Sequence, residues 1–402
     1  MYRKFLCFGI LAVSTLSAQV LPPPYASANR RHVADNLNTL DASGLLNAGL
    51  QSIVTTLSGF NSQELNHALD QFHPAIYSAL VEVQAAVGGQ LLSLFSRGPM
   101  IGRGNGKDWR FWVDPIGNWL REGNLGQQVG FEAITKGTAL GMDGAIGENW
   151  TVGFGFSWNH SALTFHQGKG RGKVDRYLGA VYADFLMECF YLGLSVYGGI
   201  DRNDIDRLIQ FPSFDSTVHG KFNSLEWAGQ FATAYLIGFP YCYFYPYASV
   251  DFLYLQGIKS SRTGIDFLHF QGNNIFETGS SALNLNIRTQ KNGTIRSEAG
   301  IGLQMQDSNH GETISIVPTF AFGWAMECPI FRPAYKSGFL EEPLPFKAKG
   351  WNHVWQLLVI DFGLAIYIYD FVLSGEYVSE MSTNSLSAYW GQWANISLEY
   401  FW

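Results

Sequence analysis

The stretch "TVGFGFSW" (residues 151–158) alternates two kinds of side chain. Val152, Phe154, Phe156 and Trp158 take every second position, and Thr, Gly, Gly and Ser lie between them. Side chains of a β-strand alternate between two faces, so this pattern predicts a strand with one large apolar face and one face of small residues. A strand of a soluble sandwich would carry abundant Lys and Glu on its polar face. The small face is typical of a strand that lines a barrel lumen.

The same pattern recurs along the chain, for example in "ETISIVPTFAFGWAM" (312–326). We predict about twelve strands, at residues 108–117, 130–145, 149–165, 174–187, 190–200, 221–238, 243–256, 294–306, 312–327, 353–369, 371–379 and 387–402. Tight turns near residues 147, 189, 241, 309 and 370 alternate with longer links at 118–129, 166–173, 201–220, 257–293, 328–352 and 380–386. Short turns alternating with long loops predict an all-β, twelve-stranded antiparallel transmembrane barrel, with the turns on the periplasmic side.

The low content of charged residues indicates that part of the protein surface faces something other than water. Charged residues make up 15% of the 402 residues and aromatic residues another 15%. Ordinary soluble domains are roughly 25% charged. No stretch beyond the N-terminus offers about 18 consecutive apolar residues, so we expect no transmembrane helix. The net charge of -7 gives no support for nucleic-acid binding.

The N-terminal region divides into three segments. Residues 1–18 have the basic start, apolar run and small residues of a signal peptide, with cleavage after residue 18 or as late as residue 28. Residues 29–97 carry apolar side chains at helical spacing and predict a helical linker or vestigial passenger that enters the lumen. Residues 98–107 are a glycine-rich hinge, and residues 108–402 form the barrel.

Five stretches resemble, in order and spacing, the translocator β-domains of the autotransporter family of Gram-negative outer membranes. They are "LNHALDQFHPAIYSAL" (65–80), "DWRFWV" (108–113), "ENWTVGFGFSW" (148–158), "YPYASVDFLYL" (245–255) and "TIRSEAGIGLQM" (294–305). The resemblance implies an outer-membrane location, a linker helix inside the pore and no cofactor. The region before the first strand is too short for the β-helix of a full passenger.

The chain ends on "NISLEYFW" (395–402), in which Ile396, Leu398, Tyr400 and Trp402 share one face. This ending resembles the C-terminal signal that the barrel assembly machinery reads in outer-membrane barrels. The family usually ends on phenylalanine, so Trp402 is a mild departure. The resemblance therefore assigns these four residues to an assembly signal.

Alternation also assigns charged side chains to the lumen. We expect the lumen to be lined by Asp184, Glu226, Asp251, Arg296, Glu298, Asp361, Glu376 and Glu399, in which Arg296 is the clear base. Such a lumen attracts cations if water passes, while the alternative is that the acids only pair with donors of the helix.

Other candidate sites have weaker signals. Cys189 and Cys242 fall in turns of neighbouring hairpins, so a disulfide between them is one hypothesis and chance placement the other. The histidines show no metal-ligand spacing, and no G-x-S-x-G motif is present, so we expect no metal site and no enzyme. The basic loop around Lys169, Arg171 and Lys173 is a candidate contact for lipopolysaccharide phosphates.

Three functions remain open from the sequence. The first is a monomeric translocator-like or structural outer-membrane protein that exposes residues 201–220, 257–293 and 328–352 as loops. The second is a porin-like channel or transporter for small solutes, which requires an open lumen. The third is a surface adhesin that acts through the same loops.

Overall fold

The computed structural model describes residues 19–96, 109–124, 128–258, 274–280, 282–288, 291–305, 314–331, 334–340, 342–350, 354–384 and 389–402. The predicted signal peptide (1–18) and the predicted hinge (98–107) lie outside these residues.

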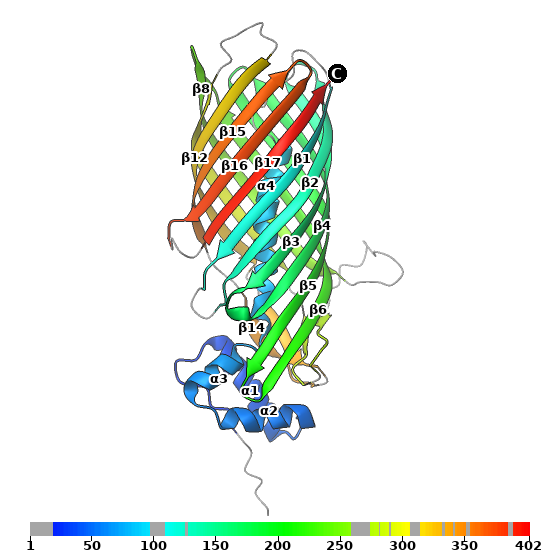
Figure 1. The fold of residues 1–402 in the computed structure, drawn as a ribbon, viewed down its shortest axis with the longest axis vertical. Helices are drawn as coiled ribbons and strands as arrows, with labels where there is room; N and C mark the ends of the chain where they lie inside the picture. The colour runs from blue at the N-terminus through cyan, green and yellow to red at the C-terminus, as the bar shows by residue number, and fades with distance from the viewer. Residues whose placement is uncertain are drawn as a thin grey trace, which may run out of the picture.

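Twelve long antiparallel strands close into a barrel, which confirms the predicted fold class (Figure 1). They are β1 (Trp109–Glu122), β2 (Phe131–Ile146), β3 (Trp150–Phe165), β4 (Gly170–Met187), β5 (Phe190–Phe211), β6 (Phe214–Tyr235), β8 (Cys242–Ile258), β11 (Asn292–Met305), β12 (Ile314–Phe331), β15 (Trp355–Ile368), β16 (Phe371–Ser382) and β17 (Tyr389–Phe401). The three-residue strand β7 (Ile237–Phe239) follows β6 after Leu236 and pairs with the first residues of β8. Closure comes from pairing of the first and last strands, β1 and β17. No sheet edge is therefore left for the bilayer to meet.

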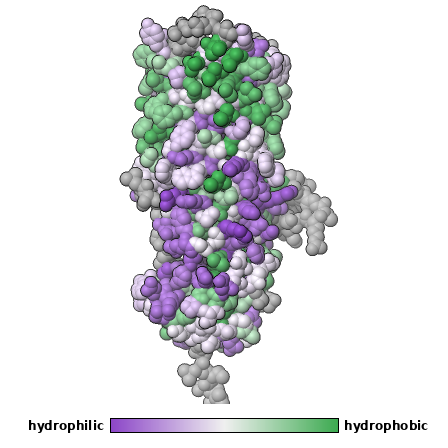
Figure 2. Space-filling view, viewed as in Figure 1, coloured by the Kyte–Doolittle hydropathy of each residue, from purple (hydrophilic) through white to green (hydrophobic). Residues whose placement is uncertain are grey.

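The end of the barrel with the short turns carries an apolar outer band (Figure 2). On β3, Val152, Phe154, Phe156 and Trp158 point outward and are 41–56% exposed. Beyond Trp158 the outward side chains become polar, beginning with His160. The apolar stretch, residues 150–158, has the length of roughly 9–11 residues that a tilted strand needs to cross a bilayer. The membrane belt thus lies at the short-turn end, near the C-terminus.

The predicted loop 201–220 is a strand hairpin instead of a loop. Strands β5 and β6 continue to pair until Phe211 meets Phe214 at the tip. The inward side chains Ile205, Arg207 and Ile209 are buried along this extension. Charged residues lie on both faces of this extension, with Arg202, Asp204 and Asp206 outward and Asp201 and Arg207 inward, so the high charge of the stretch does not mark a loop.

The other two predicted loops contribute a small second sheet at the same end. Its strands are β9 (Asn274–Phe276), β10 (Leu285–Arg288), β13 (Ala334–Phe339) and β14 (Phe346–Lys349), in the order β14-β13-β10-β9. The described parts of 257–293 and 328–352 are therefore not simply exposed loops. They build a platform with a buried face that includes Ile287, Tyr335 and Phe339.

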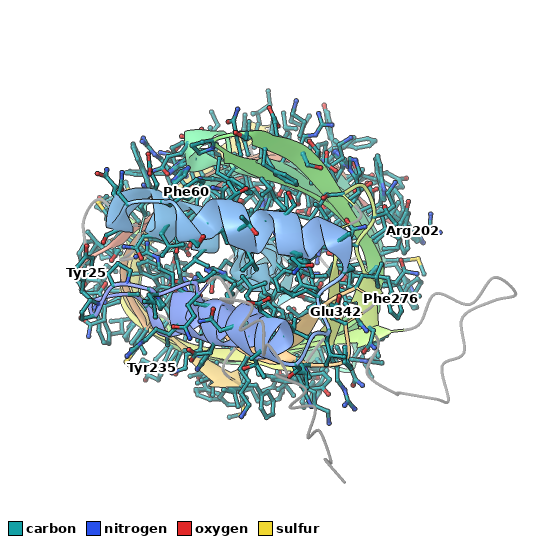
Figure 3. All side chains as sticks on the ribbon, turned by 90° about the horizontal axis from the view of Figure 1, so that it is seen from below. Tyr25, Phe60, Arg202, Tyr235, Phe276 and Glu342 are labelled. Carbon is teal, nitrogen blue, oxygen red and sulfur yellow. The ribbon has the colours of Figure 1, made fainter. Side chains whose placement is uncertain are left out.

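Three short helices cap this platform: α1 (Ala28–Ala42), α2 (Ala48–Ser58) and α3 (Ser62–Leu69). Each helix follows a capping residue whose side chain accepts a hydrogen bond from a backbone N–H of the first turn; these residues are Ser27, Asn47 and Asn61 respectively. Figure 3, seen from the cap end, shows helices lying across the barrel mouth. We call residues 19–73 the cap. It covers the end of the barrel that is remote from the apolar belt.

Helix α1 also covers the free edge of β14. Asn29 exchanges bonds of 2.8 and 2.9 Å with the backbone of Lys349, and His32 Nδ1 lies 2.8 Å from the carbonyl of Lys347. Asn36 donates to the carbonyl of Leu344 at 3.0 Å. Residues 29, 32 and 36 share one helix face, so a single row of polar side chains forms hydrogen bonds with the backbone groups at the edge of the sheet.

Behind the cap, the 3₁₀ turn η1 (Pro74–Tyr77) leads into helix α4 (Ser78–Ser96), which runs down the lumen (Figure 1). Residues Pro74–Phe95 are long and apolar enough to cross a membrane by composition, but 72% of that apolar window is buried inside the protein. The helix that the sequence predicted to enter the lumen does so.

The predicted disulfide is not formed: Cys189 and Cys242 are both free, as is Cys328. Cys189 lies in the turn between β4 and β5, whereas Cys242 begins β8. Strands β5 and β6 lie between these positions, and adjacent strands are about 4.8 Å apart. Two strand spacings exceed the roughly 7 Å between Cα atoms that a disulfide can bridge.

Candidate functional site in the barrel lumen

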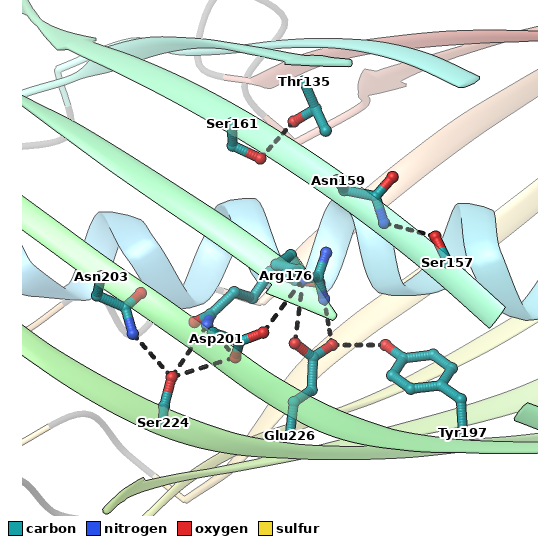
Figure 4. Close-up of polar contacts among 11 residues, drawn as sticks. Thr135, Ser157, Asn159, Ser161, Arg176, Tyr197, Asp201, Asn203, Ser224 and Glu226 are labelled. Carbon is teal, nitrogen blue, oxygen red and sulfur yellow. Dashed lines mark hydrogen bonds and ion pairs between the residues drawn. The ribbon is translucent and has the colours of Figure 1, made fainter. Parts of the chain in front are cut away.

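Helix α4 packs against one side of the lumen and is held there by a buried ionic cluster (Figure 4). At its centre, Arg176 of β4 is fully buried and pairs with Glu226 of β6, with Nε 3.1 Å from Oε2. Asp201 of β5 lies 3.6 Å from the same Nε. Tyr197 donates its hydroxyl to Glu226 at 2.6 Å. A buried charge needs such partners because unpaired burial is costly.

Gln84 joins the helix to this cluster. Its side-chain amide donates to Asp201 at 2.7 Å, and its backbone carbonyl accepts from Arg176 at 3.2 Å. Ser224 completes the set by donating to Asp201 at 3.1 Å. A carbonyl in the middle of the helix thus accepts a bond from the barrel wall, so the position of the helix along the lumen is specified.

Gly88 lets the helix approach the wall one turn further on. A Cβ built on Gly88 would lie 2.5 Å from the Tyr197 hydroxyl, which is closer than real contacts allow. A Cβ on the neighbouring Gly89 would meet no atom within 4 Å. The paired glycines do not break the helix, which is continuous from Ser78 to Ser96.

The far end of the helix is seated by aromatic rings. Phe95 packs against Trp112 and Tyr182, with ring centroids 5.9 and 6.1 Å away. Gly155 of β3 leaves room for the Phe95 ring, since a Cβ there would lie 2.6 Å from it. The small inward residues that the sequence pattern emphasised therefore make space for a lumenal helix.

A second ionic cluster connects the first strands of the barrel, β1 and β2, with the last strand, β17. Arg110 of β1 pairs with Asp143 of β2 at 2.6 Å and with Glu399 of β17 at 3.1 Å. Tyr182 donates to Asp143 at 2.7 Å and accepts from the Trp112 indole at 2.9 Å. Glu399 thus acts at the seam where the last strand meets the first.

A third cluster fixes the cap to the extended hairpin. Arg207 of β5 pairs with Glu277 at 2.5 Å and also donates to the carbonyls of Gln71 and Leu283. Tyr77 donates to Glu277 at 2.9 Å. Because Gln71 lies at the end of the cap and Tyr77 is the last residue of the turn before α4, this cluster connects the cap, the lumenal helix and the barrel.

A cavity of about 260 Å³ remains in the lumen beside α4. Ala86, Gly89, Gln90 and Ser93 line it from the helix, and β8, β11, β12, β15 and β16 contribute most of the opposite wall. The lining includes Gln304 and Val317, near strand ends at the short-turn side. The part of the lumen that the helix leaves unfilled therefore has a mixed polar and apolar lining and reaches toward the short-turn end.

The structure separates the predicted lumen charges into three groups. Asp251, Arg296, Glu298, Asp361 and Glu376 line the cavity. Glu226 and Glu399 belong to the buried ionic clusters described above. Asp184 accepts a bond of 2.8 Å from the Tyr191 hydroxyl near the short turns.

Arg296 lies in the lumen, but the sequence analysis missed other basic side chains there. Arg110, Arg176 and Arg207 are buried inside as well. The sequence does indicate Arg176, because it lies an even number of residues from Asp184 on the strand predicted at 174–187 and therefore shares its inward face. Arg207 was missed because its segment was assigned to a loop. Among the described residues no group of His, Cys, Asp or Glu has the geometry to hold a metal ion.

The geometry agrees with comparisons to known proteins. Residues 111–266 match the model of the autotransporter β-domain family. The fold is similar to the translocator domain of autotransporter NalP from Neisseria meningitidis, at 15% identity and a TM-score of 0.61, over 82% of this chain and 100% of that chain. It is also similar to the β domain of the Bordetella autotransporter BrkA, at 14% identity and a TM-score of 0.51, over 73% and 100%. No curated protein sequence matches.

The closed barrel and its apolar belt define an integral outer-membrane protein of a Gram-negative bacterium. Residues 111–266, from β1 to β8, match the autotransporter β-domain family, and the barrel as a whole has the fold of autotransporter translocator domains.

Proposed function

We propose that this barrel displays its own N-terminal region as a folded cap on the cell surface and stays closed by helix α4. The observation that carries the proposal is the path of the chain. It runs from the cap at the long-link end, through the lumen as α4, toward the short-turn end where β1 begins. Because short turns of such barrels are periplasmic, the cap lies outside the cell.

The contacts of α4 support a closed barrel more than an open pore. Arg176, Asp201 and Glu226 are all fully buried around the helix, which leaves no water path on that side. The cap and the second sheet cover the outer mouth. A porin-like function would require these elements to leave, and the buried Arg207–Glu277 pair holds them in place.

Cysteine labelling on intact cells tests this orientation. In a background with Cys189, Cys242 and Cys328 changed to Ser, we expect Gln51→Cys on the cap to react with a membrane-impermeant maleimide. The matched control is Gly147→Cys in the short turn between β2 and β3, which we expect to react only after the outer membrane is permeabilised. Labelling of Gly147→Cys but not Gln51→Cys on intact cells would reverse the proposed topology.

We also propose that the last strand carries the assembly signal. The side chains of Ile396, Leu398, Tyr400 and Trp402 all point outward, at 40–61% exposure, as a signal read from outside the sheet requires. Trp390 provides a matched control, because it is an outward tryptophan on the same strand with 44% exposure against 46% for Trp402. We expect Trp402→Ala to slow barrel assembly several-fold and Trp390→Ala to leave it near normal, measured as the heat-modifiable fraction over time. Equal slowing by both would point to general loss of membrane anchoring.

Contact with lipopolysaccharide phosphates is supported at one position of the basic loop. Arg171 is neutralised by Asp206 at 2.7 Å, and Lys169 turns toward His67 of the cap at 3.1 Å. Lys173 is exposed on β4, beyond the apolar belt. We therefore assign the contact to Lys173.

A further inference from the structure

We propose that the cavity beside α4 is a binding site for a small organic cation with primary ammonium groups, such as a diamine, reached from the periplasmic side. The inference concerns the part of the lumen that the helix leaves unfilled. It does not depend on the display of the cap.

The charge of the cavity is strongly one-sided. Its described lining carries six carboxyl side chains and one cationic side chain, Arg296. Arg296 already bonds Glu298 and Glu380, each at 2.7 Å. Asp361 and Glu376 lie in contact with one another, and neither is paired with Arg296; Glu298 is a further acid near Asp361. Two adjacent carboxyl groups repel each other when both are ionised, and a cation between them relieves that repulsion.

The cavity lining includes buried acceptor atoms without hydrogen-bond partners, both on the helix and on the barrel wall. Oε1 of Gln90, on the helix, has no hydrogen-bond partner although the side chain is only 2% exposed. Oδ1 of Asp251, 8% exposed, and Oδ1 of Asp361 on the opposite wall lack partners as well. Buried acceptors require donors. An ammonium group supplies three donors and a positive charge to the same place.

Aromatic rings favour an organic cation over a bare metal ion. Tyr245 and Tyr247 line the cavity with ring centroids 6.3 Å apart, and Tyr245 lies beside Asp361 and Glu376. Tyrosine faces attract ammonium groups, and the methylene chain of a diamine packs against the rings and against Ala86 and Gly89 of α4. In addition, no group of carboxylates among the described residues is arranged to hold a metal ion.

Isothermal titration calorimetry of the folded full chain in detergent tests the proposal with 1,4-diaminobutane. We expect one saturable site per chain, no binding of the neutral 1,4-butanediol, and no displacement by an equal concentration of Ca²⁺. The double variant Asp361→Asn, Glu376→Gln should weaken binding at least tenfold. The control Glu132→Gln, Asp175→Asn removes two carboxylates from the outer wall and should leave binding unchanged.

Heat-modifiable migration checks that each variant is a folded barrel, and Asp251→Asn offers a second cavity variant if the first does not fold. Non-saturable heats, equal binding of the diol, displacement by Ca²⁺, or the same loss in the outer-wall control would each overturn the proposal.

Discussion

Gly88 and Gly89 are neighbours in sequence but have opposite surroundings. The backbone of Gly88 lies against Tyr197 and Glu226 of the buried cluster, whereas Gly89 faces the open cavity. Glycine lowers helix stability by about 1 kcal/mol relative to alanine, so both positions weaken α4. At Gly88 that loss is offset by a contact between helix and wall that no larger residue allows.

This difference predicts opposite effects of the same substitution. Gly89→Ala should stabilise the folded protein slightly, by up to about 1 kcal/mol, because it gains helix propensity and meets no atom. Gly88→Ala should destabilise it by about 1–3 kcal/mol, since the methyl group displaces Tyr197 from Glu226. Urea unfolding followed by heat-modifiable migration measures both. Similar midpoints for the two variants would mean that the cluster does not hold the helix.

At the scale of elements, the barrel was predictable and the cap was not. The alternation seen from Val152 to Trp158 recurs along the chain, and short turns alternate with long links, so these two patterns together predict the twelve strands and the closed barrel. The cap depends on contacts distant in sequence, such as Asn29 with Lys349 and Gln71 with Gln210. No local sequence pattern predicts such pairs. The buried ionic cluster could be predicted only in part. The alternation of side chains along β4 places Arg176 inside the barrel, but no sequence pattern shows that Gln84 of the helix contacts the cluster.

The docking of α3 on the barrel should depend on pH. Burial lowers the pKa of His67 from its ordinary value of 6.5, and the nearby Lys169 ammonium lowers it further. Burial raises the pKa of Asp70, but hydrogen bonds from His73 and Arg30 outweigh this effect and hold it below its ordinary value of 3.8. An undocked cap therefore takes up a proton at His67 more readily than a docked one, so docking weakens as pH falls. Arg30 and His73 belong to the cap itself, so protonation of Asp70 weakens the folded cap and not its docking.

We therefore expect docking of the cap to weaken as pH falls below about 6.5, through protonation of His67, and the fold of the cap itself to weaken below pH 3.8, through protonation of Asp70. The rate of amide hydrogen exchange in the cap, corrected for the intrinsic effect of pH, measures both effects. His67→Gln should remove the first step and keep the second. A first step that persists in this variant would have to come from another group.

For the whole molecule, two structures close the lumen in series. The cap covers the outer mouth, and α4 fills one side of the channel from the mouth toward the short turns. They are joined at η1, where Tyr77 contacts Glu277 and Glu277 in turn contacts Arg207. The barrel wall does not depend on the helix for its own charges, since Arg176 pairs with Glu226 of the wall itself.

Planar-bilayer conductance separates the two closures. We expect low, unsteady conductance from the full-length protein, and nearly the same from a variant lacking residues 19–73, because α4 still occupies the lumen. A variant lacking residues 19–96 should conduct steadily and favour cations, because the helix is gone while the acidic wall of Asp251, Asp361 and Glu376 remains. Heat-modifiable migration must show a folded barrel in each case. If removal of the cap alone opened the channel fully, the cap would be the element that closes the lumen, and α4 would only connect the cap to the barrel. The side of the lumen around Arg176 would then have to admit water once the cap is absent.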